Sequence, residues 1–117
     1  MLSIKSIRFG ALNVPLHTAF GIAQGAQTCA ENVWVEVTLS DGSVGLGEAA
    51  PFPAVNGETQ AQVLDALEGA DALWIGQSAL AWRTRCAEAH EAFVSTRSAS
   101  AALECALLDG LTQAHNI

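Results

Sequence analysis

The side chains of this 117-residue chain that could act in acid–base or nucleophilic chemistry are scattered along the sequence. No serine or cysteine has the neighbours of a recognisable nucleophile motif. His90 follows an apolar helix position and is expected on the surface. His115 is expected near a helix C-terminus, where positive charge is favourable. Only His17 falls in an irregular segment of the kind that contacts substrates.

Glu48 and Glu58 flank a proline-containing loop and are the carboxylates that could converge there. Each also suits a structural role. Glu48 follows a glycine at a strand end, where we expect a buried, hydrogen-bonded carboxylate. Glu58 precedes a helix, whose N-terminus favours negative charge. A magnesium site needs several converging carboxylates, and the acidic residues between positions 65 and 71 are expected on a solvated helix face. We therefore expect no metal site and no cofactor in this chain.

The cysteines and the charge balance narrow the functional class. Cys29, Cys86 and Cys105 are odd in number and form no CxxC pair, so we expect free, buried thiols in the cytoplasm and no zinc site. The formal net charge of −7 makes nucleic acid or an anionic membrane an unsuitable partner. No run of 18 apolar residues could span a membrane, and the N-terminus lacks the apolar segment of a signal peptide.

The composition is unusually apolar for a single domain of this size. Half of the residues are hydrophobic and only 15% are charged, against roughly 25% charged in an average globular protein. One explanation is a face covered by a partner, including a second copy of the chain in a homo-oligomer. The alternative is an alanine-rich helical core.

The first half of the chain has the two-residue period of strands. We predict strands over 3–14, 32–39 and 43–48, with Pro15 ending the first and a long loop over 15–31. Asp41-Gly42 predicts a tight hairpin turn, and the small residues Gly45 and Gly47 predict close approach of another surface. The three strands therefore form an antiparallel meander.

After Pro53 the period becomes helical. Helices are predicted over about 59–68, closed by Gly69, and over about 78–94. A last helix is capped by Ser98 or Ser100, and its apolar side includes Leu103, Leu107 and Leu111. Three strands followed by about three helices make an α+β fold rather than an alternating parallel-sheet fold.

These pieces resemble the N-terminal capping domain of the enolase superfamily, in its mandelate racemase and muconate lactonizing branch. The resemblance covers nearly the whole chain, and within the branch it is closest to dipeptide epimerases and muconate cycloisomerases. The matching segments are Val14-Pro15-Leu16 with Phe20, Asn32-Val33-Trp34-Val35-Glu36-Val37, Asp41-Gly42, Gly45-Leu46-Gly47-Glu48-Ala49-Ala50-Pro51, Asn56-Gly57-Glu58-Thr59 and Ala102-Leu103-Glu104-Cys105-Ala106-Leu107-Leu108-Asp109.

The resemblance implies a division of labour with a second domain. In this superfamily a modified (β/α) barrel carries three carboxylate ligands for Mg²⁺ and the bases that remove a proton next to a substrate carboxylate. The capping domain supplies two loops that close the barrel mouth, exclude water and select the small carboxylate substrate. Here those loops correspond to about 16–28 and 50–56. The implied substrate-facing residues are His17, Thr18, Phe20, Ile22, Pro51, Phe52 and Val55.

The sequence ends at Ile117, where the linker into the barrel is expected, and it contains no Lys-x-Lys base motif. We therefore expect residues 1–117 to be one capping domain that is inactive alone, with its barrel and Mg²⁺ supplied by the same or a separate chain. The alternative is a stand-alone remnant or binding module that self-associates through its barrel-facing surface.

Overall fold

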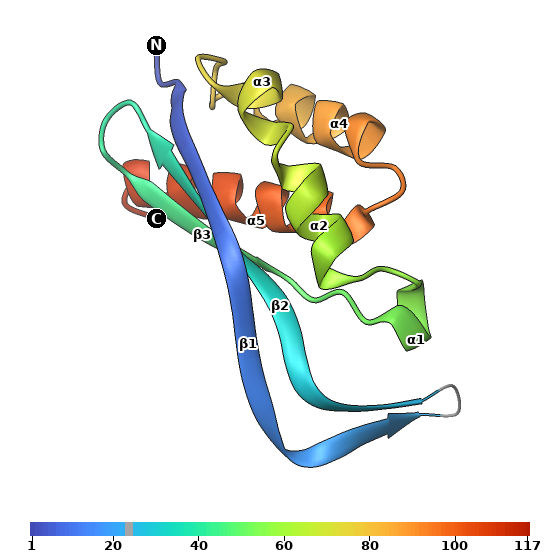
Figure 1. The fold of residues 1–117 in the computed structure, drawn as a ribbon. Helices are drawn as coiled ribbons and strands as arrows, with labels where there is room; N and C mark the ends of the chain where they lie inside the picture. Colours follow the sequence, from blue (N-terminus) through green and yellow to red (C-terminus); the bar gives the residue numbers. More distant parts are fainter. Residues whose placement is uncertain (23–24) are drawn as a thin grey trace.

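A three-stranded antiparallel sheet is followed by helices in a computed structural model (Figure 1). The structure describes the backbone of residues 1–22 and 25–117, and the side chains of residues 1–16 and 29–117. Five helices lie in this described part, which confirms the predicted α+β class. The elements are β1 (Ile4–Ile22), β2 (Gly25–Leu39), β3 (Val44–Ala49), α1 (Pro53–Asn56), α2 (Gln60–Leu67), α3 (Ala70–Trp74), α4 (Trp82–Ala92) and α5 (Arg97–Ala114).

The core lies between one face of the sheet and the helices. Val33, Val35 and Val37 alternate along β2 as predicted and are fully buried. α5 crosses the sheet behind β3 in Figure 1, and its apolar side is buried. That side combines the predicted leucines with alanines, so the described part contains the alanine-rich helical core that the composition suggested. Its buried residues on α5 include Ala99, Ala102, Leu103, Ala106, Leu107 and Leu111.

Two glycines of β3 allow α5 to pack directly on the strand backbone. A Cβ atom at Gly45 would lie 1.9 Å from the carbonyl oxygen of Ala106. At Gly47 it would lie 2.1 Å from the carbonyl oxygen of Ala102. The predicted close approach is therefore confirmed. β3 is an edge strand, and its outward N–H at Leu46 donates to Asp109 Oδ2 of α5 at 2.8 Å.

The predicted loop over 15–31 is wrong for most of its length, because both strands continue through it. β1 runs on to Ile22 and β2 begins at Gly25. Pro15 does not end β1, since an edge strand tolerates a residue without an N–H donor. Beyond Pro15 the register shifts, and residues 16–19 stand opposite the single residue Thr28. Such a bulge bends a strand, and the hairpin bends sharply along this stretch in Figure 1.

The helices follow the predictions with several corrections. Thr59 caps α2, and its side chain forms a reciprocal capping box with Gln62. Gly69 is not a left-handed cap, since its φ is −85°. The N-cap of α5 is Thr96, so the predicted caps Ser98 and Ser100 both lie inside the helix. α1 and α3 were not predicted, because four and five residues are too few to show a helical period. In the described part of the chain, no helix has the length and apolarity needed to cross a membrane.

Candidate functional site

Two segments project toward the same end of the molecule in Figure 1. One is the β1–β2 arm, residues 12–22 and 25–32, which lies beyond the last β2–β3 pair at Val33 and Ala49. The other is the α1 loop, residues 50–57, which connects β3 to α2 and contains α1. These segments contain the two loops implied by the resemblance.

The predicted substrate-facing residues divide between these segments. In the α1 loop, Pro51 is buried, Phe52 is half-buried and Val55 is 64% exposed. Of the three predicted residues in the α1 loop, Val55 is therefore the most accessible to a ligand, and the buried Pro51 is the least accessible. The other predicted residues are in the β1–β2 arm, with backbones in β1 and side chains outside the described ones: His17, Thr18, Phe20 and Ile22.

The two flanking carboxylates do not converge. Glu58 is 6% exposed, and its oxygens accept hydrogen bonds from the backbone N–H and the hydroxyl of Ser98, in the first turn of α5. The predicted helix N-terminal role is therefore correct in kind, but the helix is α5, 40 positions along the chain. Sequence proximity pointed only to α2, which begins at Gln60.

Glu48 is exposed, which corrects the prediction that it is buried. β3 points this side chain to the sheet face away from the helices, where it borders an open hollow of about 330 Å³ with Trp34 and Leu46. The predicted structural hydrogen bond is present, because Asn32 Nδ2 donates to Glu48 Oε2 at 2.6 Å. This pairing fixes β2 to β3 at the base of the β1–β2 arm.

The histidines with described side chains lie outside these two segments. His90 is exposed and pairs with Glu104 at 3.3 Å, which confirms its surface position. His115 is the C-cap of α5, as expected, and its Nδ1–H donates to the carbonyl oxygen of Leu111 at 2.9 Å. Among the described residues no group of three or more His, Cys, Asp or Glu is arranged to hold a metal ion. The described residues therefore do not form the set of carboxylate ligands for Mg²⁺ that the resemblance implies for the barrel.

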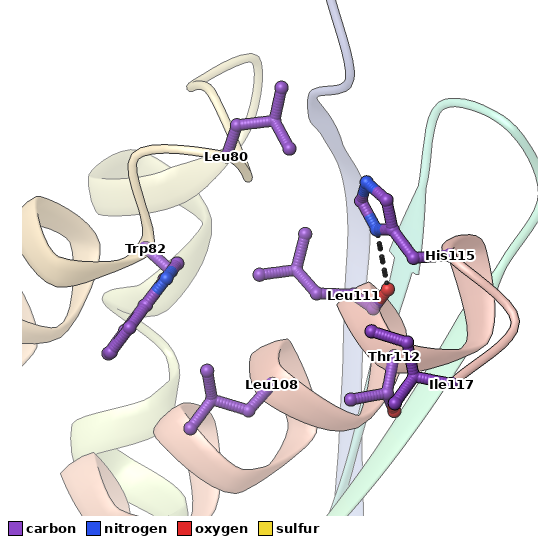
Figure 2. Close-up of a pocket in the computed structure, with 7 residues that line it drawn as sticks. All are labelled: Leu80, Trp82, Leu108, Leu111, Thr112, His115 and Ile117. Atoms are coloured by element: carbon purple, nitrogen blue, oxygen red, sulfur yellow. Dashed lines mark hydrogen bonds between the residues drawn. The ribbon is translucent and has the colours of Figure 1, made fainter.

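An apolar cavity of about 490 Å³ opens between α4 and α5. Figure 2 shows Trp82 on one side, with Leu108 and Leu111 projecting from α5. Sequence periodicity predicted the helix over about 78–94 but did not reveal the cavity, because the cavity walls come from separate segments. The remaining lining residues are Leu80, Thr112, His115 and Ile117.

The sequence profile described as "Mandelate racemase / muconate lactonizing enzyme, N-terminal domain" matches residues 5–117. The chain belongs to this family. The match spans the sheet and every helix in the described part, so the arm and the α1 loop are elements of the family domain.

Relatives of this mandelate racemase/muconate lactonizing N-terminal domain include named dipeptide epimerases. The chain is 44% identical over 115 residues to an aromatic dipeptide epimerase from Herpetosiphon aurantiacus, covering 98% of this chain and 32% of that protein. It is 38% identical over 98 residues to a hydrophobic dipeptide epimerase from Citrifermentans bemidjiense, covering 84% of this chain and 27% of the relative.

Solved structures of the family have the same fold. A mandelate racemase/muconate lactonizing protein from Herpetosiphon aurantiacus superposes with a TM-score of 0.92 at 44% identity, covering 97% of this chain and 32% of that one. A substrate-liganded L-Ala-D/L-Glu epimerase from Bacillus subtilis superposes with a TM-score of 0.90 at 29% identity, covering 97% and 32%. The chain thus spans about a third of the length of the relatives it matches.

The three thiols of this family domain are free but differ in exposure, which corrects the prediction that all are buried. Cys86 is buried, Cys29 is intermediate and Cys105 is exposed. Burial raises the pKa of the Cys86 thiol to about 11, and the neighbouring Glu104 carboxylate contributes to the shift. A thiol reacts with electrophiles as the thiolate, so Cys86 is unsuited to act as a nucleophile at neutral pH.

We expect iodoacetamide at pH 8 to modify Cys105 in the folded protein and to leave Cys86 unmodified. Peptide mass spectrometry after timed quenching measures this difference. Because the Cys86 pKa is raised, its alkylation should keep accelerating with pH up to about 11. A Cys105→Ser variant is the control, since any fast modification that remains at pH 8 should then belong to Cys29. Rapid labelling of Cys86 at pH 8 would contradict the buried, protonated thiol.

Proposed function

We propose that this chain is the substrate-selecting cap of a dipeptide epimerase that acts on dipeptides with hydrophobic side chains. The observation that carries the proposal is the 44% identity, over 98% of this chain, to a relative named as an aromatic dipeptide epimerase. A relative named as a hydrophobic dipeptide epimerase supports the same class of substrate. The exposed Val55 in the α1 loop suits contact with an apolar substrate side chain.

In this proposal the cap shapes and closes the site, and a (β/α) barrel carries the chemistry. Epimerisation requires a base to remove the α-proton next to the carboxylate and an acid to return a proton to the opposite face. No metal-binding cluster lies among the described residues. We assign the bases and the Mg²⁺ to the barrel, where the resemblance implies them. The part of the cap is to exclude water and to hold the substrate side chain.

The cavity between α4 and α5 supports an interaction with a partner surface. Leu80 is 57% exposed and Ile117 is 92% exposed at its rim. Exposed apolar patches of this kind are typical of interfaces. We assign this surface to the barrel. The alternative is self-association of the chain through the same surface. Sedimentation analysis distinguishes the two, because a stable homodimer should remain a homodimer when a barrel is added.

A chimaera tests the function directly. The matched third of the Herpetosiphon aurantiacus relative is replaced by residues 1–117, and dipeptides with alanine, leucine, phenylalanine or tyrosine as second residue are incubated in D₂O. We expect loss of the α-proton NMR signal for the hydrophobic dipeptides with the chimaera, and no exchange with residues 1–117 alone. The unaltered relative is the positive control. A chimaera that melts cooperatively, yet exchanges none of these dipeptides, would sink the proposal.

A further inference from the structure

Residues 58–60 connect the two projecting segments to the body of the domain. Glu58, directly after the α1 loop, binds the N–H and hydroxyl of Ser98. The N–H groups in the first turn of a helix lack intrahelical partners, and the helix dipole favours a carboxylate there. Glu58 thus fixes the end of the α1 loop on α5, the longest helix in the described part of the chain.

Gln60 makes the corresponding connection to the β1–β2 arm. Its side-chain Nε2 donates to Asn13 Oδ1 of β1 at 2.7 Å and to the backbone carbonyl of Asn32 in β2 at 2.9 Å. Asn32 lies one residue before Val33, where the pairing with β3 stops. Gln60 therefore holds both strands at the point where the arm leaves the three-stranded sheet.

The residues around these two anchors make the connection stiff. Thr59, between them, is fixed by its capping box with Gln62. Asn56 Oδ1 accepts from the backbone N–H groups of Phe52 and Glu58, at 3.2 and 3.0 Å, and so closes the α1 loop on itself. The capping box satisfies backbone N–H groups within the first turn of α2. The bonds of Glu58 and Gln60 instead reach partners 28 to 47 positions away.

We propose that Glu58 and Gln60 are positioning residues that set the α1 loop and the β1–β2 arm relative to each other, and so determine which substrate side chains fit between them. The inference rests on the proposed function and names two residues that set its substrate selectivity. Neither side chain is proposed to touch the substrate. Each acts by holding a segment in place, so its loss should weaken the binding of the substrate side chain rather than the chemical step.

The test compares Glu58→Ala, Gln60→Ala and the double variant in the active chimaera. We expect KM for phenylalanine- and tyrosine-containing dipeptides to rise by about tenfold in each single variant, with kcat changed much less, because binding of the substrate side chain rather than proton transfer is disturbed. Glu58→Gln keeps a carbonyl acceptor for Ser98, so its KM should be close to that of the unmodified chimaera. Glu91→Ala, at an exposed position of α4, is the matched control for Glu58→Ala and should change neither constant.

Amide hydrogen exchange on residues 1–117 provides a readout that does not need activity. Exchange in both the α1 loop and the arm should accelerate in each single variant, since residues 58–60 hold the two together. Faster exchange only in the segment nearest the substitution, or an unchanged KM at a temperature where the variant is folded, would overturn the positioning role. An inactive unmodified chimaera would count against the proposed function alone, and the exchange result would still decide the positioning role.

Discussion

Gly45→Ala and Gly47→Ala should each strongly destabilise the domain. Each substitution replaces one Cα hydrogen of the glycine by a methyl group, which would lie about 2 Å from backbone atoms of α5. Backbone atoms cannot rotate out of the way as the atoms of a side chain can. Overpacking of a core typically costs about 1–3 kcal/mol and occasionally more. Because the nearest atoms all belong to the α5 backbone, these variants are expected at the upper end of this range, with a loss of at least about 3 kcal/mol. Urea denaturation followed by circular dichroism measures it.

Gly69→Ala is the matched control for these two substitutions. Gly69 has a φ of −85°, and a Cβ there would meet its nearest neighbour at 3.5 Å, an ordinary contact. Ala also narrows the unfolded ensemble, so Gly69→Ala should leave stability unchanged or raise it by a few tenths of a kcal/mol, up to about 1. Similar unfolding midpoints for Gly45→Ala and Gly69→Ala would show that α5 does not rest on the backbone of β3.

The strand pattern of this domain was predictable because it depends on local alternation. Val33, Val35 and Val37 alternate with Trp34 and Glu36, and one face of β2 is buried as that alternation requires. The close approach of another surface at Gly45 and Gly47 could also be predicted, since small residues at alternate positions of a strand leave room for backbone. The identity of that surface, α5, could not, because it lies more than 50 positions away.

The β1–β2 arm and the anchors of the candidate site could not be predicted from spacing. Pro15 and the residues after it lack a two-residue period, and only the pairing with β2 makes them a strand. Glu58 was expected to act at the N-terminus of the next helix along the chain, but tertiary packing places α5 there instead. Gln60 offered no signal at all, because a glutamine at the start of a helix is ordinary in sequence.

Trp74 is the other position with a large expected effect, and periodicity did not mark it, because α3 is only five residues long. Its side chain is fully buried, and its Nε1–H donates to the carbonyl oxygen of Arg85 in α4 at 3.0 Å. Trp74 therefore fastens α4 to the rest of the core. Trp74→Ala should cost about 3–5 kcal/mol. For a domain with a stability of about 10 kcal/mol, within the usual range of about 5–15, that loss is roughly 30–50% of the total.

Trp74→Phe and Trp82→Ala separate the reasons for that loss. Trp74→Phe keeps most of the apolar volume and removes the hydrogen bond, so it should cost about 1 kcal/mol. Trp82 is half-buried, stacks under the Arg83 guanidinium at 4.2 Å and lines the cavity between α4 and α5. If the barrel covers that cavity, Trp82→Ala should weaken docking of a barrel more than it lowers the stability of the chain alone. Thermal unfolding with and without the barrel distinguishes a core tryptophan from an interface one. Equal losses at positions 74 and 82 in the isolated chain would contradict this assignment.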